Sequence, residues 1–497
     1  MERKWEKSDR LYDKLADYGK EDYYPLHMPG HKRNTSLCRM ENPYEIDITE
    51  IEGFDNLHQP EGVLLSLAER IAGLFGSKKA YPLVNGSTAG ILTGIMAATR
   101  RGDQVLLARN SHKSIYHGII LGGLVPEYIY PQKVEGMTAL GGFLPSDIEK
   151  ALIKNQKIKL VIIISPSYEG VVSDIKTIAE IAHRHGARLL VDEAHGAHFS
   201  FHDLLPVSAV RLGADLVIQS LHKTLPAFTQ TAVLHSNCEE LNTKIEKYLA
   251  IHQSSSPSYL LMSGIDQCIG LLEDHKQGLF EEYLKRLDRV TQDLAHLKHF
   301  RLLGKELIGV SGVYALDPSK LTVIIQDGIL AGKELSELLY QRYHLVLEMS
   351  ASDYVLGMTS ICDTEEGLRR FVKAMTEIDR DLEEGRLPQK TSAGQYSGRK
   401  NLLYEQTSFQ PVMKLLPVEA FEQPTETVDF IMSDHRCSAS FVCLFPPGQP
   451  ILAPGEIITN DLIDYVMDMK QQGITVTGLT GPDQDRIEVI WETERIL

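Results

Sequence analysis

"SDIKTIAEIAHRHGARLLVDEAH", residues 173–195, decides the fold class of this chain. Its first part has the apolar spacing of an amphipathic helix, with a Ser/Asp start and a Gly stop. Its second part, "ARLLVD", is a short apolar run of the kind found in buried strands. A helix that leads directly into a buried strand is typical of a parallel sheet covered by helices on both faces.

The same alternation extends over residues 81–235. The predicted strands are "AYPLV" (80–84), "DQVLLA" (103–108), "PEYIY" (126–130), "IKLVIIIS" (158–165), "ARLLVD" (187–192), "ADLVIQ" (214–219) and "TAVLH" (231–235). Helices are predicted at "STAGILTGIMAAT" and "HKSIYHGIILGG", each after a strand. We therefore expect an α/β large domain with a mostly parallel seven-stranded sheet, whose ligands lie at the carboxyl ends of the strands.

The rest of the chain divides around this region. Residues 1–80 are an N-terminal segment, residues 81–298 are the large domain with long helical patterns at its end, and residues 299–385 form a smaller αβ domain. The polar stretch 386–400 is predicted to be a linker, and residues 401–497 a separate α+β C-terminal domain with a final strand "RIEVIWE".

Composition narrows the cellular setting. The 497 residues are 43% hydrophobic and carry a formal net charge of −16, which disfavours binding to nucleic acid or to an anionic membrane. No stretch approaches the roughly 20 apolar residues of a membrane span, and the charged first residues do not resemble a signal peptide. None of the six cysteines lies in a C-x-x-C pair, so we expect a protein of the reducing cytoplasm without a disulfide framework or a thiolate zinc site.

Polar residues follow three of the predicted strands. After the first strand, Gly86, Ser87 and Thr88 lie just before a helix, where backbone N–H groups and the helix dipole suit a phosphate. The loop is neither a Walker A motif nor a G-x-G-x-x-G turn. A simple Ser/Thr helix cap is the alternative.

Asp192 ends the strand "ARLLVD" and is predicted to point into a site of low dielectric, where a carboxylate needs a cation. A solvated aspartate is the alternative. A metal site built from Asp192, His195, His198 and His202 is another, although no H-E-x-x-H motif is present.

The third strand end lies in "SLHKTLPAFTQTA", residues 220–232, and carries Ser220, His222 and Lys223. An isolated lysine is usually a surface residue, but here it follows a phosphate loop and a buried acid at ends of the same sheet. One cofactor needs all three: pyridoxal 5'-phosphate has a phosphate, a ring nitrogen that stays protonated beside a carboxylate, and an aldehyde that forms a Schiff base with lysine.

The sequence also resembles the bacterial ornithine/lysine/arginine decarboxylases. The resemblance rests on "LHMPGHKRN", "LVNGSTAG", "RNSHKS", "VDEAHGAHFSFHDLLP", "SLHKTLPAFTQ" and "FPPGQPILAPGE", which follow one another in the family's order over nearly the whole chain. It implies the aspartate-aminotransferase-like fold (PLP fold type I), in a short form without the family's N-terminal wing domain, and decarboxylation of a basic amino acid. Arg33 and His435 stand where the family pattern has glycine, Ser440 where it has glutamate and Phe445 where it has tyrosine. These departures affect the expectation for substrate recognition.

The resemblance implies a role for each motif residue. Lys223 corresponds to the Schiff-base lysine, Asp192 to the partner of the ring nitrogen, and His112 to the histidine stacked on the ring. The other expected cofactor contacts are Gly86, Ser87, Thr88, Ala194, Ser220 and His222. His112 as a helix cap is an alternative, and the roles of His27 and His31 in the P-G-H motif are open. Ser256, in "SSSPSY", is expected to reach the phosphate in a neighbouring subunit of a homodimer or larger homo-oligomer.

The substrate expected from the resemblance is arginine or lysine, with ornithine possible, giving agmatine, cadaverine or putrescine in polyamine metabolism. Glu456 is a candidate partner for the distal cation of the substrate. A fold-type-I aminotransferase is the main alternative, but such enzymes hold the substrate carboxylate with an arginine, and Leu356 stands at the aligned position. A metallohydrolase using His195, His198 and His202, and a PLP-binding regulator without catalysis, are more distant alternatives.

Overall fold

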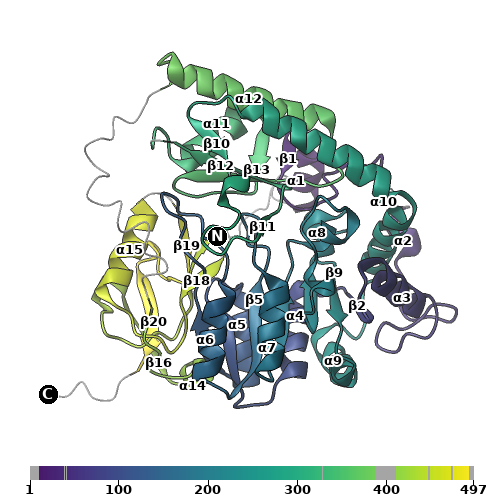
Figure 1. Cartoon of the computed structure of the whole chain (residues 1–497), viewed down its shortest axis with the longest axis vertical. Helices are drawn as coiled ribbons and strands as arrows, with labels where there is room; N and C mark the ends of the chain where they lie inside the picture. Colours follow the sequence, from purple (N-terminus) through teal and green to yellow (C-terminus); the bar gives the residue numbers. More distant parts are fainter. Residues whose placement is uncertain are drawn as a thin grey trace, which may run out of the picture.

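A computed structural model describes residues 11–38, 40, 42–326, 328–387, 410–445, 448–471 and 474–491. Its largest sheet has seven strands in the order β2-β9-β8-β7-β5-β3-β4 (Figure 1). The strands are β2 (Lys79–Leu83), β3 (Gln104–Ala108), β4 (Val125–Ile129), β5 (Ile158–Ile164), β7 (Arg188–Asp192), β8 (Leu216–Gln219) and β9 (Ala232–Ser236). Each strand predicted between residues 80 and 235 is present, so the expected seven-stranded sheet is confirmed.

The sheet is mostly parallel. β4, β3, β5, β7 and β8 pair in parallel, and β9 pairs antiparallel with both β8 and β2. β2 therefore runs in the same direction as β8. As a result, the carboxyl ends of β2, β7 and β8 meet at one edge of the sheet, which is the edge where ligands bind in open α/β sheets.

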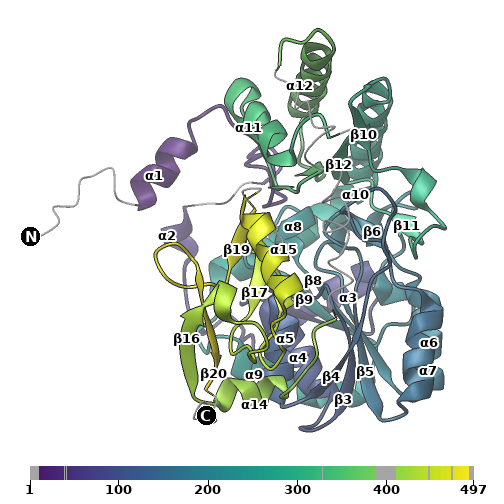
Figure 2. The same ribbon diagram turned by 90° about the vertical axis from the view of Figure 1, so that its left-hand side faces the viewer.

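Helices cover both faces of this sheet (Figures 1 and 2). On one face, α4 (Gly86–Ala98), α5 (Lys113–Gly122) and α9 (Glu239–His252) pack into one apolar cluster with the strands. On the other face, α6 (Pro145–Lys154) and α7 (Ile175–Arg184) do the same. Asp174 caps α7, as the sequence pattern predicted, because its side chain accepts a hydrogen bond from the N–H of Thr177.

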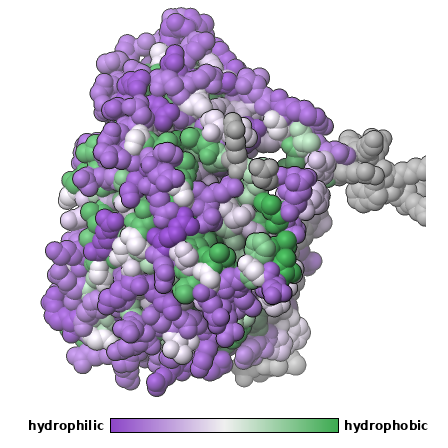
Figure 3. Space-filling view, turned by 90° about the vertical axis from the view of Figure 1, so that its right-hand side faces the viewer, coloured by the Kyte–Doolittle hydropathy of each residue, from purple (hydrophilic) through white to green (hydrophobic). Residues whose placement is uncertain are grey.

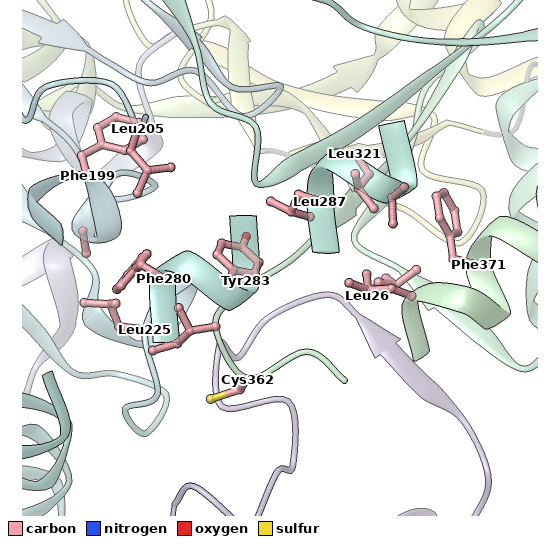
Figure 4. Close-up of a cluster of buried hydrophobic side chains, with 14 of the residues drawn as sticks. Leu26, Phe199, Leu205, Leu225, Phe280, Tyr283, Leu287, Leu321, Cys362 and Phe371 are labelled. Atoms are coloured by element: carbon pink, nitrogen blue, oxygen red, sulfur yellow. The ribbon is translucent and has the colours of Figure 1, made fainter. Parts of the chain in front are cut away.

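A second, antiparallel sheet lies above the first one in Figure 1 and has the order β10-β12-β15-β14. Its strands are β10 (Phe300–Leu302), β12 (Lys320–Ile325), β15 (Tyr354–Met358) and β14 (Met349–Ser350). It packs with α10 (Tyr259–Leu294), α11 (Gly332–Tyr343) and α12 (Glu365–Glu383). Figure 4 shows part of the apolar cluster that joins these elements, with Phe280, Tyr283 and Leu287 of α10 beside Leu321 and Phe371.

The stretch "HLVLEMS" (344–350) belongs to the smaller αβ domain that the sequence predicts, and the structure forms two strands from it. β13 (Leu345–Leu347) pairs in parallel with β1 (Tyr24–Leu26), whereas β14 pairs with β15 in the four-stranded sheet. Glu348 lies between the two strands. The N-terminal segment thus supplies a partner strand that the local pattern could not reveal. This segment also contains α1 (Leu11–Tyr18), α2 (Pro43–Ile46) and α3 (Val63–Phe75).

The C-terminal part packs beside the large sheet, as Figure 2 shows. It contains α14 (Pro417–Glu422), α15 (Asn460–Gln471) and two small sheets. β16 (Thr425–Asp429) pairs with β20 (Arg486–Ile490), and β17 (Val442–Phe445) pairs with β18 (Gln449–Leu452) and β19 (Thr475–Thr477). A further two-stranded ladder joins β6 (Val171–Val172) to β11 (Ala315–Leu316).

The predicted domain boundaries remain predictions, and most of the predicted linker at 386–400 lies outside the described residues. Within the ranges that the structure describes, no helix combines the length and the apolar character that crossing a membrane requires.

Candidate active site

The site lies where β2, β7 and β8 end. α4 begins at Gly86 directly after β2, Asp192 is the last residue of β7, and α8 (Leu221–Thr224) follows β8 and carries Lys223. Asp192 pairs with Ile218 in the ladder between β7 and β8, which places the acid beside the strand that leads to the lysine. The sheet therefore brings together residues that are more than one hundred positions apart in the sequence.

Lys223 has a defined partner. Its Nζ lies 3.1 Å from Nε2 of His195. Burial lowers the pKa of Lys223, while the nearby carboxylates of Asp192 and Glu348 oppose the shift. Burial and the charge of Lys223 also hold the pKa of His195 well below its ordinary value, so this ring is neutral. The lysine is thus held within the site by a neutral imidazole and is not an ordinary solvated cation.

Asp192 is buried, with a relative exposure of 5%. One of its oxygens accepts a hydrogen bond from the N–H of Ala194 at 3.1 Å. Burial raises its pKa, and the charge of Lys223 counteracts that rise. The alternative of a solvated strand-end aspartate is therefore wrong. A carboxylate in this environment favours a cationic group placed beside it.

The residues of the predicted phosphate loop lie within α4. Gly86, Ser87 and Thr88 form the first turn of α4 and do not precede it. The helix has no side-chain cap from Asn85, so the alternative of a simple cap at this position is not supported. The hydroxyls of Ser87 and Ser220 lie 2.6 Å apart, although they come from different strand ends. Thr88 is exposed, and Gly86 adopts a φ of +75°.

His222 and His112 both have local partners. Nδ1 of His222 lies 2.8 Å from the carbonyl of Thr231, and burial lowers the pKa of this histidine to about 4. His112 is the N-cap of α5 and accepts a hydrogen bond from the N–H of Ser114. The capping alternative for His112 is confirmed. His112 is exposed as a residue, yet desolvation by the atoms around its ring and the charge of Lys223 lower its pKa. Stacking on a cofactor ring stays a prediction.

The three histidines of the metal alternative do not converge. His195 contacts Lys223, His198 lies 3.0 Å from the carboxylate of Asp317, and His202 accepts a hydrogen bond from the N–H of Leu204. In the described parts of the chain, no three His, Cys, Asp or Glu side chains are placed to hold a metal ion. The arrangement gives the metallohydrolase alternative no support.

The second sheet contributes residues that the sequence interpretation missed. Glu348 accepts hydrogen bonds from the hydroxyl of Tyr168 at 2.5 Å and from the N–H of Met28 at 2.9 Å. The ring of Tyr168 lies 4.5 Å from that of His195. Glu348 also acts electrostatically on Lys223. A single acid within the apolar run "HLVLEMS" was the signal that could have identified it.

The P-G-H motif connects the two sheets. The N–H of Gly30 donates to the carbonyl of His222 at 2.7 Å, and the carbonyl of Gly30 accepts from the hydroxyl of Ser360 at 2.5 Å. A Cβ at Gly30 would lie 2.6 Å from the carbonyl oxygen of Leu225, so only glycine allows this approach. Nδ1 of His27 contacts the carbonyl of Met28, and Nδ1 of His31 accepts from the N–H of Arg33.

Three further residues that the sequence analysis named lie elsewhere in the fold. Glu456 is fully buried and forms an ion pair with Arg109 at 2.9 Å. Leu356 is buried in an apolar cluster that also contacts Tyr168 and Met28. Ser256 is exposed just before α10. The substrate contact of Glu456 and the intersubunit contact of Ser256 stay predictions.

The residues present fit pyridoxal phosphate. The Ser87 and Ser220 hydroxyls with the free N–H groups of the first turn of α4 are suited to a phosphate. The buried carboxylate of Asp192 is suited to a protonated ring nitrogen, and the amine of Lys223 to an aldehyde. The three groups come from the same edge of one sheet.

Comparisons with known proteins agree with this arrangement. The family model "Orn/Lys/Arg decarboxylase, major domain" matches residues 10–324. An arginine decarboxylase of Bacillus subtilis (strain 168) is 31% identical over 498 residues, covering 98% of each chain. The lysine decarboxylase LdcA of Pseudomonas aeruginosa is 23% identical over 561 residues, covering 91% of this chain and 74% of its own. The crystal structure of the Francisella novicida lysine decarboxylase LdcF superposes with a TM-score of 0.79 at 19% sequence identity. The match covers 96% of this chain and 80% of that one, and it shows that the two chains share a fold.

Proposed function

The chain belongs to the Orn/Lys/Arg decarboxylase family of PLP-dependent enzymes, and from this premise we propose that it decarboxylates arginine to agmatine and CO₂ in the cytoplasm, as a step of polyamine metabolism. The convergence of Lys223, Asp192 and the Ser87–Ser220 hydroxyl pair carries the proposal. Arginine is favoured because the arginine decarboxylase relative matches over 98% of both chains, with higher identity than the lysine decarboxylase relative. Lysine and ornithine are the other basic amino acids to test.

The role proposed for each residue follows from its environment. Bound pyridoxal phosphate supplies an electron sink for the pair of electrons left on Cα when CO₂ departs. Asp192, buried beside the site, keeps the ring nitrogen protonated, and the first turn of α4 with Ser87 and Ser220 holds the phosphate. Lys223 would anchor the aldehyde carbon, and its amine, released when the substrate amino group takes its place, would return a proton to Cα. His195 holds that amine in place through the 3.1 Å contact.

Glu348 is proposed to bind the distal cation of the substrate. The charge of its carboxylate acts to raise the pKa of the Lys223 amine. Hydrogen bonds from the hydroxyl of Tyr168 and from the N–H of Met28 orient the carboxylate. An oriented carboxylate accepts hydrogen bonds from the planar guanidinium of arginine in a fixed geometry. This assignment replaces Glu456 as the first candidate, because the charge of Glu456 is already paired with the cation of Arg109, whereas the partners of Glu348 are neutral donors.

A screen of CO₂ release over arginine, lysine and ornithine tests the reaction and its substrate together. We expect the highest kcat/KM with arginine, agmatine as the amine product, and no stoichiometric keto acid. Lys223→Ala should lose the visible absorbance of the cofactor–lysine adduct and reduce kcat at least about 10⁴-fold, because the covalent anchor is removed. Keto acid formed in proportion to substrate would instead identify an aminotransferase.

The enzyme is proposed to act as a homodimer or a larger homo-oligomer. Figure 3 shows apolar patches on the face of the molecule seen from the right-hand side of Figure 1. Exposed apolar side chains near the start of α10 are Ile51, Phe54, Val63 and Phe228. Phe54 packs edge-on against Tyr259, and Phe228 packs on Gly264, so these two residues lie against the first turns of α10, which follows the segment that carries Ser256. Patches of this kind mark interaction sites.

Val63→Asp tests this surface without harming the monomer, because Val63 is the first residue of α3 and an aspartate is favourable there. We expect a lower mass by light scattering, equal to half the wild-type value if the wild type is a dimer, and weaker cofactor retention. Ile431→Asp, at an exposed position of the C-terminal part, is the matched control and should keep the wild-type mass. A monomeric wild type would contradict the proposal.

A further inference from the structure

Lys320, the first residue of β12, is a buried cation that the proposed mechanism does not use. Its side chain has a relative exposure of 0%, and its amine has no hydrogen-bond partner in the part of the chain that the structure describes. The nearest carboxylate oxygen, of Asp317, is 4.0 Å away. Leaving a buried ammonium without hydrogen bonds is costly, so its retention calls for a ligand.

Asp317 is already satisfied by other groups. It accepts hydrogen bonds from the N–H and the hydroxyl of Ser319, and it lies 3.0 Å from Nε2 of His198. The carboxylate therefore has partners of its own and does not depend on the amine of Lys320. Burial lowers the pKa of Lys320 to about 8, with Asp317 opposing the shift, so most of the amine is charged at neutral pH.

The register of the second sheet shows which way Lys320 faces. Lys320 pairs with Met358 and Thr322 pairs with Leu356 in the antiparallel ladder between β12 and β15. Directly paired residues place their side chains on the same face of a sheet. Met358 and Leu356 pack in the apolar cluster that contacts Tyr168 and Met28, so Lys320 also lies on the face directed at these residues.

That face borders the Lys223 site. Tyr168 contacts the ring of His195, which in turn contacts the amine of Lys223. The loop of Tyr168 also packs on Lys320, since a Cβ at Gly170 would lie 2.8 Å from Cγ of Lys320. His195 and His198 belong to one short segment after β7, so the partner of Asp317 and the partner of Lys223 are three residues apart. The charge of Lys320 also contributes to the low pKa of His195.

We propose that Lys320 binds the α-carboxylate of the amino-acid substrate, an inference that rests on the proposed decarboxylase function. Lys320 is a diagonal neighbour of Leu356, the position aligned with the carboxylate-binding arginine of aminotransferases. In this chain the cation is Lys320 on β12, whereas the position aligned with the aminotransferase arginine, Leu356, lies on β15. A single ammonium holds a carboxylate as a point charge and not as a bidentate fork, which leaves the bond to Cα free to orient.

This assignment distinguishes substrate from product. The amino acid has the carboxylate and gains the contact, whereas the product amine has lost it as CO₂ and does not. Replacing Lys320 should therefore weaken substrate binding and leave product binding unchanged. A residue that only shapes the site would affect both ligands equally.

The test compares the wild-type holoenzyme with Lys320→Met, using the KM of arginine and the inhibition constant of agmatine. The expected result is a KM raised about tenfold to a hundredfold, because a charged hydrogen bond is lost, with an inhibition constant within about twofold of wild type. The melting temperature should be no lower, since an unpaired buried charge is removed. Lys333→Met, at an exposed position of α11, is the control and should change neither constant.

Three outcomes would overturn the assignment: an unchanged KM, a parallel rise in both constants, or loss of cofactor in both Lys320→Met and Lys320→Gln. Failure of the proposed function would look different, because the wild type would then release no CO₂ from any basic amino acid. In that case, titration of the cofactor absorbance with arginine and agmatine still measures the discrimination without turnover. Equal affinities in the wild type would then exclude a carboxylate contact.

Discussion

The seven-stranded and the four-stranded sheets contribute to one site in different ways. The seven-stranded sheet delivers Asp192, Lys223 and the start of α4 through the carboxyl ends of strands that run in the same direction. The four-stranded sheet is antiparallel and delivers Glu348 from a connection between strands and Lys320 from a strand face. The first set is proposed to bind the cofactor, and the second is proposed to hold the two ends of the substrate.

The difference has a simple origin in sheet geometry. In a parallel arrangement, all carboxyl ends lie at one edge, so polar residues that follow strands are expected to meet. An antiparallel sheet has no such common edge, and a side chain reaches the site only if its face and register are correct. The candidate functional residues at the seven-stranded sheet can therefore be predicted from the order of residues in the sequence. Those at the four-stranded sheet cannot.

The N-terminal segment holds the two sheets together at this point. β1 pairs with β13, the N–H of Met28 donates to Glu348, and Gly30 bonds both to His222 and to Ser360. The buried amine of Lys32 donates to the carbonyls of His27 and Met358 at 2.7 Å. The P-G-H motif is thus a structural connection between the two sheets, and so between the proposed cofactor site and the proposed substrate contacts.

The largest effect is expected on the cofactor side. Asp192→Asn keeps an oxygen for the N–H of Ala194 but removes the charge that is proposed to hold the ring nitrogen protonated. Because each 1.36 kcal/mol in the barrier is tenfold in rate, we expect kcat to fall roughly 10³-fold or more with arginine KM little changed. Steady-state CO₂ release measures both. A fall of less than tenfold would show that the acid does not act on the electron sink.

A smaller, selective effect is expected on the substrate side. Glu348→Gln keeps the shape of the side chain and removes its charge, so arginine KM should rise about tenfold to a hundredfold while the cofactor absorbance stays normal. Glu337→Gln, at an exposed position of α11, is the matched control and should behave as wild type. If Glu348→Gln lowered kcat with unchanged KM, Glu348 would belong with the catalytic groups and the contrast between the sheets would fail.

The smallest effect is expected at the connection. In Gly30→Ala the new methyl group would press on the backbone of Leu225, two residues after Lys223, so we expect a loss of about 1–3 kcal/mol in the free energy of unfolding and a reduced kcat. Urea denaturation measures the free energy of unfolding, and steady-state kinetics measure kcat. Gly73→Ala is the control, because a Cβ there meets nothing within 4 Å inside α3, and the substitution should stabilise the protein slightly. Equal behaviour of the two variants would contradict the tight contact.

Two departures from the family pattern occur at positions with an unusual backbone conformation. Arg33 and His435 stand in segments where the resemblance led us to expect glycine, and both adopt a left-handed backbone, with φ of +57° and +61°. The backbone conformation that favours glycine is thus kept, although the glycine is not. Arg33 gains a compensating contact, since its guanidinium lies 5.1 Å from the ring centre of Tyr18.

The sequence by itself determined the strands of the large sheet, the family and the residues at the ends of β2, β7 and β8, because periodicity and strand order are local properties of the chain. It did not determine that "HLVLEMS" divides between two sheets, that His195 holds Lys223, that Arg109 neutralises Glu456, or that Lys320 faces the site. Those depend on pairing register and on contacts between segments far apart in the chain. Only the tertiary structure fixes such contacts, because their energy comes from burial and long-range packing that no short stretch of sequence contains.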